Sequence, residues 1–507
     1  MSKVEASVEA PRAERRDGVW ILVAIAVAFA IAHVLTNGRY GFHRDELQFL
    51  TDASHLDWGF VPYPPFTAFV EHIGLTLFGL SLIGLRVFSV LAQAVVITVS
   101  GLMARDLGGG RVAQVFTALA VGLSPVPVFQ ATEFQYSSFD LMWWVLIAWF
   151  IIRLLKDENP RWWLAIGAAV GLGLETKYSI VFYIAGILVG VVLTNARKYL
   201  LSIWFWAGIT VALVIFAPNL IWLTRHHFIS YTFLQYIHKR DVGEGRAEGF
   251  LLGQFMANAN LFAAPVWVAG VVAFFLSKRY RMLGWMYLVP VAIFWTSKGR
   301  FYYVSGVYPM VLAMGAAAWE QWLAHRPKWA QVTVATVGFA GVAFIGAVVW
   351  ARLVPIAQDG PLKQYALNHS GDLREEIGWD EMVKTVAAVR DSLPQEQQAH
   401  LGIAVGNYGE AGAIEILGPQ YHLPPPISTT NSAWLRGYPT PQPTTIIVLG
   451  NSKNRLDEIF TGCRWAAHNG NSQGVKNEES DDHPDIYVCG PLKKPWAEFW
   501  AATEDFG

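Results

Sequence analysis

Charged residues are scarce in this chain. They make up only 15% of its 507 residues, whereas a soluble protein usually carries about a quarter. Hydrophobic residues make up 53%, and the mean hydropathy is +0.33. This composition excludes an ordinary soluble globular protein and predicts an integral membrane protein with a soluble appendage. The net charge of −1 decides nothing about nucleic acid, which is not among the expected partners.

Cysteine is nearly absent, and metal-ligand spacings are missing. The chain has two cysteines, Cys463 and Cys489. If they lie outside the cytoplasm, that compartment permits disulfides, so we expect them to be bonded, with two separate thiols as the alternative. The pairs His226-His227 and Glu71-His72 lack a recognised ligand spacing, which favours structural roles. The chain also shows no clear internal repeat.

Long apolar runs are abundant between residues 19 and 350. They lie near 19–36, 81–104, 112–130, 139–155, 162–176, 179–194, 200–222, 255–276, 282–297, 301–319 and 329–350. Because a span needs about 17–25 apolar residues, these runs predict about eleven transmembrane helices. The runs on either side of 175–179 and of 297–300 also fit one hydrophobic region interrupted by a polar re-entry. The first run is expected to be a retained anchor, because no small-residue cleavage site follows it.

Lysine and arginine recur in every second connection between these runs. They are Arg12, Arg15 and Arg16, then Arg105 and Arg111, Arg153, Lys156 and Arg161, Arg197 and Lys198, Lys278, Arg279 and Arg281, and Arg326 and Lys328. Because short cytoplasmic loops are rich in Lys and Arg, this alternation predicts a cytoplasmic N-terminus and an odd number of spans. The first loop and the part beyond residue 352 are then expected on the extracytoplasmic side of the cell membrane.

The composition changes near residue 353, where long apolar runs stop. Two short runs, 402–406 and 445–450, are typical of buried parallel strands that end at a glycine. Residues 379–393 show the apolar spacing of a helix. We therefore expect a multi-spanning membrane domain at 1–352 and a soluble extracytoplasmic α/β domain at 353–507.

Two adjacent carboxylates, Asp45 and Glu46, follow the first apolar run. Charge beside a bilayer is costly to desolvate and is more often functional than charge elsewhere. A general base, a metal ligand and a proton relay all fit this pair. The alternative is a solvated loop without a chemical role.

Acidic, basic and aromatic side chains share the predicted outer face. They include Glu133, Tyr136 and Asp140 in the second outer loop, Lys177 in the third, and Arg300 and Tyr302 in the fifth. A carboxylate can take a proton from an attacking hydroxyl, and Lys and Arg can neutralise a phosphate leaving group. The alternative for Lys177 and Arg300 is that they lie at helix ends and extend their charged groups toward water, as snorkelling residues do. The long fourth loop, 224–249, fits a mobile lid or a plain loop.

The order of these residues resembles a known family. The matching residues are Asp45-Glu46 after the first span, Pro64-Pro65 before the second, 171–178 with Lys177, 298–302 with Arg300 and Tyr302, Tyr308-Pro309, and 406–411 in the C-terminal part. In this order they resemble the bacterial members of the protein O-mannosyltransferase-like group, related to dolichyl-phosphate-mannose-protein mannosyltransferases. These are GT-C-type integral membrane glycosyltransferases that use polyprenyl-phosphate sugars.

The resemblance implies an inverting transfer. Asp45 would be the base that deprotonates the acceptor hydroxyl, with Glu46 as a supporting group. Lys177 and Arg300 match positions of phosphate-binding cations, with Tyr302 nearby. This sequence departs from the simplest pattern at Arg44, which we expect to pair with Asp45 or Glu46.

A second departure concerns the second outer loop. Glu133 and Asp140 both stand where some relatives keep an acid near a metal or the acceptor. With Tyr136, which lies between them in the sequence, they are the expected acceptor or second acidic site. The use of a divalent metal is therefore left open, and no cofactor is assigned.

Three functions fit this sequence. The leading one is a glycosyltransferase that moves a sugar from a polyprenyl-phosphate donor to a glycan, lipid or protein acceptor hydroxyl at the extracytoplasmic face. A transporter or flippase of a lipid-linked sugar is the alternative, although such proteins often show internal repeats and charges near the midplane. A membrane anchor for an outer binding domain ranks last, because so many spans exceed what an anchor requires.

Overall fold

The computed structural model describes residues 17–506 and divides into two compact units. Unit 1 comprises the chain up to Asn37, then Arg86–Arg225 and His238–Val354. Unit 2 comprises Gly38–Leu85, His226–Ile237 and the chain from Pro355 onward. The first loop after the N-terminal helix thus groups with the C-terminal part, a pairing that a boundary at residue 352 does not anticipate. Of the basic residues used for the orientation, Arg12, Arg15 and Arg16 lie outside the described residues.

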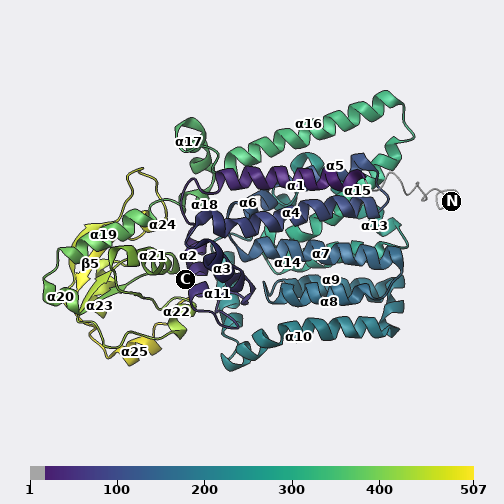
Figure 1. Ribbon diagram of the computed structural model, residues 1–507. Coiled ribbons are helices and arrows are strands. Elements are labelled where there is room, and N and C mark those ends of the chain that lie inside the picture. Colours follow the sequence, from purple (N-terminus) through teal and green to yellow (C-terminus); the bar gives the residue numbers. More distant parts are fainter. Residues whose placement is uncertain (1–16, 507) are drawn as a thin grey trace. The chain divides into compact units, whose positions relative to one another are not determined.

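Unit 1 is built from helices whose long members run side by side (Figure 1). Its α-helices are α1 (Asp17–Thr36), α4 (Leu82–Asp106), α5 (Arg111–Gly122), α6 (Pro125–Thr132), α7 (Tyr136–Asp157), α8 (Trp162–Leu174), α9 (Ile180–Leu193), α10 (Ile203–Arg225), α12 (Phe250–Met256), α13 (Ala264–Leu276), α14 (Arg281–Thr296), α15 (Tyr308–Leu323) and α16 (Lys328–Leu353). Its 3-10 turns are η1 (Asn195–Leu201), η2 (Leu261–Ala263) and η3 (Phe301–Val307).

Six helices among residues 17–506 are long and apolar enough to cross a membrane, or nine if each bent pair counts as one span. The bent pairs are α5 with α6, α9 with η1, and α12 with the segment from Leu261 to Leu276. The expected count of eleven is therefore not reached. The runs at 162–176 and 282–297 form helices of only 13 and 16 residues, α8 and α14, and the second has Pro290 in its interior. The number of such helices nevertheless identifies the chain as a multi-pass membrane protein.

Glycine allows the helices of unit 1 to approach one another closely. A Cβ on Gly208 of α10 would lie 2.3 Å from the carbonyl oxygen of Trp163 in α8. A Cβ on Gly270 of α13 would lie 1.9 Å from the carbonyl oxygen of Val311 in α15. Small residues at such crossings are typical of membrane helices, where packing replaces the hydrophobic drive between helices.

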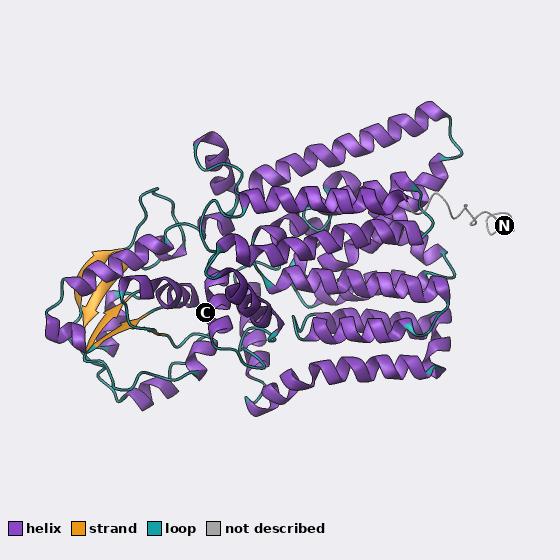
Figure 2. Cartoon of the chain, in the orientation of Figure 1, coloured by secondary structure: helices purple, strands orange, loops and turns teal. Residues whose placement is uncertain are grey.

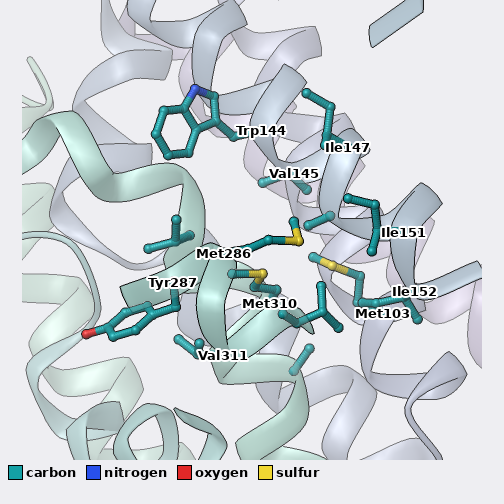
Figure 3. Close-up of a cluster of buried hydrophobic side chains, with 14 of the residues drawn as sticks. Met103, Trp144, Val145, Ile147, Ile151, Ile152, Met286, Tyr287, Met310 and Val311 are labelled. Atoms are coloured by element: carbon teal, nitrogen blue, oxygen red, sulfur yellow. The ribbon is translucent and has the colours of Figure 1, made fainter. Parts of the chain in front are cut away.

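Most of the core of unit 1 is one large apolar cluster (Figure 3). Trp144 of α7 stacks on Tyr183 of α9, with ring centroids 4.3 Å apart. Met103, Met286 and Met310 come from three different helices and fill the space beside them. Methionine suits such irregular gaps because its side chain is unbranched and flexible. This core fixes the ends of α7 and α9, near which the polar side chains of the site lie.

Unit 2 combines short helices with the strands of the chain (Figure 2). Its α-helices are α2 (Arg44–Ser54), α3 (Phe66–Phe78), α17 (Gly360–His369), α18 (Gly371–Arg374), α19 (Trp379–Asp391), α20 (Gln395–Ala399), α21 (Tyr408–Leu417), α22 (Ser432–Leu435), α23 (Lys453–Ile459), α24 (Glu478–Asp481) and α25 (Trp496–Ala501), with the 3-10 turn η4 (Gly418–Tyr421). Its strands are β1 (Leu401–Ala404), β2 (Pro426–Ile427), β3 (Thr445–Val448), β4 (Arg464–His468) and β5 (Asp485–Cys489).

The five strands form one sheet in the order β2-β1-β3-β5-β4. The two apolar runs predicted as strands are β1 and β3, and they pair in parallel, with Ile403 opposite Ile447. β5 and β4 continue the sheet in the antiparallel sense. A disulfide joins Cys463 to Cys489, as expected from the sequence. It ties the segment before β4 to the end of β5.

The predicted lid or plain loop at 224–249 is wrong in its secondary structure. Residues Ile229–Gly243 form a helix, α11, of 15 residues. Ile229, Phe233 and Ile237 recur every four residues, which is the spacing of one helix face. Phe233 packs edge-on against Phe506, with ring centroids 5.9 Å apart.

Candidate active site

The acid pair lies in the first turn of α2, in unit 2. His43 is the N-cap of this helix, and its backbone N–H donates to Glu46 Oε2 at 2.8 Å, which completes a capping box. Glu46 is fully buried, whereas Asp45 is partly exposed. A carboxylate in the first helical turn is also favoured by the positive end of the helix dipole. Glu46 therefore holds the helix start, and Asp45 is the acid that solvent can reach.

Asp45 is hydrogen-bonded to a tyrosine from the C-terminal part of the chain. The Tyr408 hydroxyl donates to Asp45 Oδ1 at 2.9 Å, across a sequence separation of 363 residues. Within residues 17–506, Asp45 Oδ2 accepts no hydrogen bond. One oxygen is thus fixed, while the second is available to accept a proton.

Arg44 does not pair with Asp45 or Glu46, so that expectation is wrong. It forms an ion pair with Glu478 and lies 4.0 Å from Glu479. Its guanidinium also stands over the Tyr408 ring, 4.7 Å from the centroid. Neighbouring helical residues point about 100° apart because a turn has 3.6 residues, so Arg44 and Asp45 face different partners.

The predicted cations come together in unit 1, around a set of tyrosine rings. Lys177, between α8 and α9, has its ammonium 5.0 Å from the ring centroid of Tyr136 and 4.7 Å from that of Tyr303. Burial lowers the pKa of Lys177, whereas the nearby charge of Asp140 raises this pKa and that of Arg300 lowers it. A cation over aromatic faces keeps its N–H donors available, which suits binding of an anion.

Arg300 is held by Asp241, a carboxylate near the end of α11. Its Nε donates to Asp241 Oδ2 at 2.6 Å, and its Nη1 donates to the Tyr302 hydroxyl at 3.0 Å. Burial lowers the pKa of Arg300, but the hydrogen bond to Asp241 and the neighbouring tyrosines raise it overall, so the guanidinium stays charged. The ring centroids of Tyr302 and Tyr303 lie 5.0 Å apart. Tyr302 contacts Arg300 and Tyr303 contacts Lys177, so the two tyrosines link the two cations.

The segment from Glu133 to Asp140 contains two buried acids with separate partners. Asp140 Oδ1 accepts a hydrogen bond from Trp144 Nε1 at 2.9 Å. Glu133 Oε2 accepts one from Gln135 Nε2 at 2.6 Å. Asp140 acts electrostatically on Lys177, and Tyr136 supplies one of its rings. Of the two predicted acids, Asp140 is therefore the one that belongs to the cation cluster.

A second ionic group in unit 2 lies toward the other end of α2. Asp52 is buried, accepts a hydrogen bond from the Tyr63 hydroxyl and pairs with Arg436. Burial raises the pKa of Asp52, although Arg436 and Tyr63 lower it. A cavity of about 280 Å³ lies beside this group, lined by residues of α2, α21 and the chain between Pro419 and Gly437.

The described residues 17–506 contain no group of three or more His, Cys, Asp or Glu side chains arranged to hold a metal ion. His72 Nδ1 lies 2.9 Å from the carbonyl oxygen of Ala53, and Glu71 is fully buried. The Glu133 and Asp140 carboxylates are engaged by Gln135 and Trp144. The described residues 17–506 thus contain no set of side chains that fits a metal ion.

Three contributing residues were not singled out from the sequence: Asp241, Tyr303 and Tyr408. Asp241 is separated from Arg300 by 59 residues, and a helix connects it to the preceding span. Tyr303 follows Tyr302 directly, so the run of aromatics after Arg300 was a usable signal. Tyr408 lies in the stretch 406–411 that carried the family resemblance, but nothing local in the sequence links it to Asp45.

The chain is similar in sequence to known glycosyltransferases. The family model for dolichyl-phosphate-mannose-protein mannosyltransferase matches residues 62–222. The lipid A galacturonosyltransferase RgtD of Rhizobium johnstonii is 24% identical over 338 residues, which cover 64% of this chain and 70% of that protein. The undecaprenyl phosphate-alpha-4-amino-4-deoxy-L-arabinose arabinosyl transferase 1 of Pseudomonas fluorescens is 25% identical over 331 residues, 58% of this chain and 59% of that protein.

The chain is similar to membrane glycosyltransferases. Among solved structures, ArnT from Cupriavidus metallidurans bound to undecaprenyl phosphate superposes with a TM-score of 0.57 over 93% of this chain and 97% of that chain, at 16% identity. At this identity the likeness shows a shared fold. The predicted resemblance to GT-C-type glycosyltransferases, the enzyme class and the multi-pass membrane character are confirmed.

Proposed function

We propose that this chain transfers a sugar from a polyprenyl-phosphate donor to an acceptor hydroxyl at the extracytoplasmic face of the cell membrane. The observation that carries the proposal is the cluster of Lys177, Arg300 and Tyr302 in unit 1. Two cations and a phenol at the ends of membrane helices suit a lipid-linked phosphate, because charge at a membrane needs a compensating partner. The named relatives that use undecaprenyl phosphate support this donor class.

In the proposed reaction Asp45 is the general base. Its carboxylate takes the proton from the acceptor hydroxyl as that oxygen attacks the sugar C1. The bond between C1 and the phosphate oxygen breaks, and polyprenyl phosphate leaves with the electron pair. Attack from the face opposite the leaving group inverts the configuration at C1. Glu46 supports Asp45 by capping the helix on which both acids lie.

The leaving phosphate gains charge as the bond breaks. We assign its stabilisation to Lys177 and Arg300, with the Tyr302 hydroxyl as a further donor. Arg300 is preorganised because Asp241 fixes its guanidinium, and a fixed donor stabilises developing charge without reorganising. The ammonium of Lys177 is held by rings rather than by an oxygen acceptor within residues 17–506, so phosphate meets no competing carboxylate bond there.

For the acceptor we propose a chemical class, a hydroxyl group, and no single molecule. Tyr136, Glu133 and Asp140 form the proposed acceptor or second acidic site, of which Tyr136 and Asp140 lie beside Lys177. Two relatives are named a lipid A galacturonosyltransferase and a lipopolysaccharide core galacturonosyltransferase. A glycan or lipid hydroxyl is therefore the first acceptor to test, with a protein side chain as the second.

The proposal requires the acidic loop and the C-terminal part to face away from the cytoplasm. An odd number of spans that starts from a cytoplasmic N-terminus would place both there, with residues 1–352 as the membrane domain and 353–507 as the extracytoplasmic domain. The Cys463–Cys489 disulfide supports this orientation, because disulfides persist in oxidising compartments. The transporter or flippase alternative is not favoured, since the named relatives are transferases.

Mass analysis of envelope glycans and glycolipids, with and without the protein, tests the function. A sugar that disappears with the protein and returns with a plasmid copy is the expected result, and its mass names the donor sugar and acceptor together. An unchanged glycan profile, combined with a changed distribution of the lipid-linked sugar across the membrane, would support a flippase instead.

A further inference from the structure

Residues of the C-terminal part reach the proposed base. Helix α21 begins at Tyr408, and its N-cap Asn407 accepts a hydrogen bond from the Glu410 backbone N–H at 2.9 Å. The Tyr408 hydroxyl then donates to Asp45 Oδ1 at 2.9 Å. Asp45 lies in the first loop of the chain and Tyr408 in the sheet-bearing part, yet both belong to unit 2.

The tyrosine is held in place from several directions. Arg44 stands over its ring at 4.7 Å and is itself paired with Glu478. Asn407 Nδ2 donates to Glu479 Oε1 at 3.3 Å, which anchors the start of α21 to the same acidic segment. A hydroxyl carried by such a constrained ring can fix a carboxylate, because both side chains lose little further freedom on pairing.

The backbones of α2 and α21 also pack closely. A Cβ on Gly412 would lie 2.6 Å from the carbonyl carbon and oxygen of Leu47, and one on Gly409 would lie 3.1 Å from Arg44 Cβ. Only glycine permits this approach at position 412. The close contact sets the distance between the two helices, and thereby the reach of Tyr408 to Asp45.

We propose that Tyr408 is a positioning residue for Asp45, so that the C-terminal part completes the catalytic site and is more than an appendage. This inference rests on the proposed function. By holding Oδ1, the Tyr408 hydroxyl sets the rotation of the carboxylate and presents Oδ2 to the acceptor hydroxyl. Small errors in the placement of a reacting group cost large factors in rate, so the effect belongs to kcat.

The test uses the full chain in lipid vesicles, with undecaprenyl-phosphate-linked galacturonic acid and 4-amino-4-deoxy-L-arabinose as donor probes and lipid A as acceptor. Released undecaprenyl phosphate is measured against donor concentration. Tyr408→Phe is expected to lower kcat about 10- to 100-fold, while the KM for donor stays within about twofold of wild type. The matched control is Tyr421→Phe, because Tyr421 also donates to an aspartate, Asp380, at 2.8 Å in the same unit. This control is expected to match wild type.

A second variant guards against a folding defect. Replacement of Tyr408 by 3-fluorotyrosine keeps the ring and the hydroxyl, and is expected to retain kcat. If Tyr408→Phe equals wild type, or if the fluorotyrosine variant falls as far as Phe does, the positioning role is overturned while the proposed function stands. If wild type itself releases no undecaprenyl phosphate from either donor, the proposed function fails and the inference with it.

Discussion

Lys177 illustrates how a single side chain carries the donor assignment. Its ammonium lies between the rings of Tyr136 and Tyr303, and burial lowers its pKa while Asp140 opposes that effect. A lysine that merely snorkelled would extend toward water. This one stays half-buried against aromatic faces, which fits a cation kept for an anionic ligand.

Lys177→Ala tests this assignment. A charge-assisted hydrogen bond is worth about 1.5–3 kcal/mol, which corresponds to about 10- to 100-fold in affinity. We expect the KM for a polyprenyl-phosphate sugar to rise by about that factor, because the lost contact is to the phosphate of the donor. Initial rates over a donor titration measure it.

The matched control for that variant is Lys298→Ala, since Lys298 is exposed and close to Arg300 in sequence. It should leave the donor KM unchanged. Equal KM values for the Lys177 variant and wild type would remove Lys177 from the phosphate site.

A second prediction for a single residue concerns Glu410 and the pH dependence of stability. Burial and, to a smaller extent, the charge of Glu479 raise its pKa, whereas the hydrogen bond from the Gly406 backbone N–H lowers it, and the net result is a pKa of about 8. A folded-state pKa above the unfolded value means that the unfolded chain releases its proton first. The stability that Glu410 contributes is therefore complete below the ordinary carboxyl range and is lost as the pH rises through about 8.

Glu410→Gln removes this pH dependence, because an amide can still accept the hydrogen bond from Gly406 without a charge. We expect the variant and wild type to unfold alike near pH 4 and the variant to be more stable at pH 9. Thermal unfolding across that range measures the difference. The exposed Glu396→Gln serves as control, and a gap between Glu410→Gln and wild type that stays constant with pH contradicts the assignment.

At the scale of elements, the contact between α2 and α21 joins the first loop to the sheet-bearing part of unit 2. Its geometry depends on Gly412, because a Cβ there would overlap the backbone of Leu47 at 2.6 Å. Helix α19 also packs against α21, through Trp379 at Gly409.

Gly412→Ala should therefore destabilise unit 2 by about 1–3 kcal/mol, the usual cost of overpacking. It should also lower kcat, since α21 carries Tyr408. Gly470→Ala is the matched control, because a Cβ at position 470 meets nothing within 4 Å. Unfolding in detergent, followed for both variants, gives the comparison. Indistinguishable unfolding midpoints would show that the helices can separate without loss.

At the scale of the whole molecule, local patterns in the sequence predicted the membrane character, the two strands β1 and β3, and the disulfide. Lys177, Arg300 and Tyr302 could be singled out because polar residues between apolar runs stand out, and the structure brings them close together. The count of spans was less accurate, because α8 and α14 are short and several apolar runs bend at breaks that hydropathy does not register.

Long-range pairs were not predictable in this way. Tyr408 meets Asp45 across 363 residues, and Arg44 meets Glu478 across 434. The expected pairing of Arg44 with its neighbour in sequence was wrong because α2 points the two side chains in different directions. Asp241 was not predicted as a partner of Arg300, because a loop was expected where α11 forms.

The central claim is that Asp45 is the base of a polyprenyl-phosphate sugar transfer, and turnover by the purified chain tests it most directly. Wild type, Asp45→Asn and, as a neighbouring acid, Asp57→Asn are compared in vesicles by the release of undecaprenyl phosphate. The account predicts release by wild type and Asp57→Asn, and a loss of at least about 100-fold in Asp45→Asn with donor binding unchanged. Turnover in Asp45→Asn at the wild-type rate would contradict it.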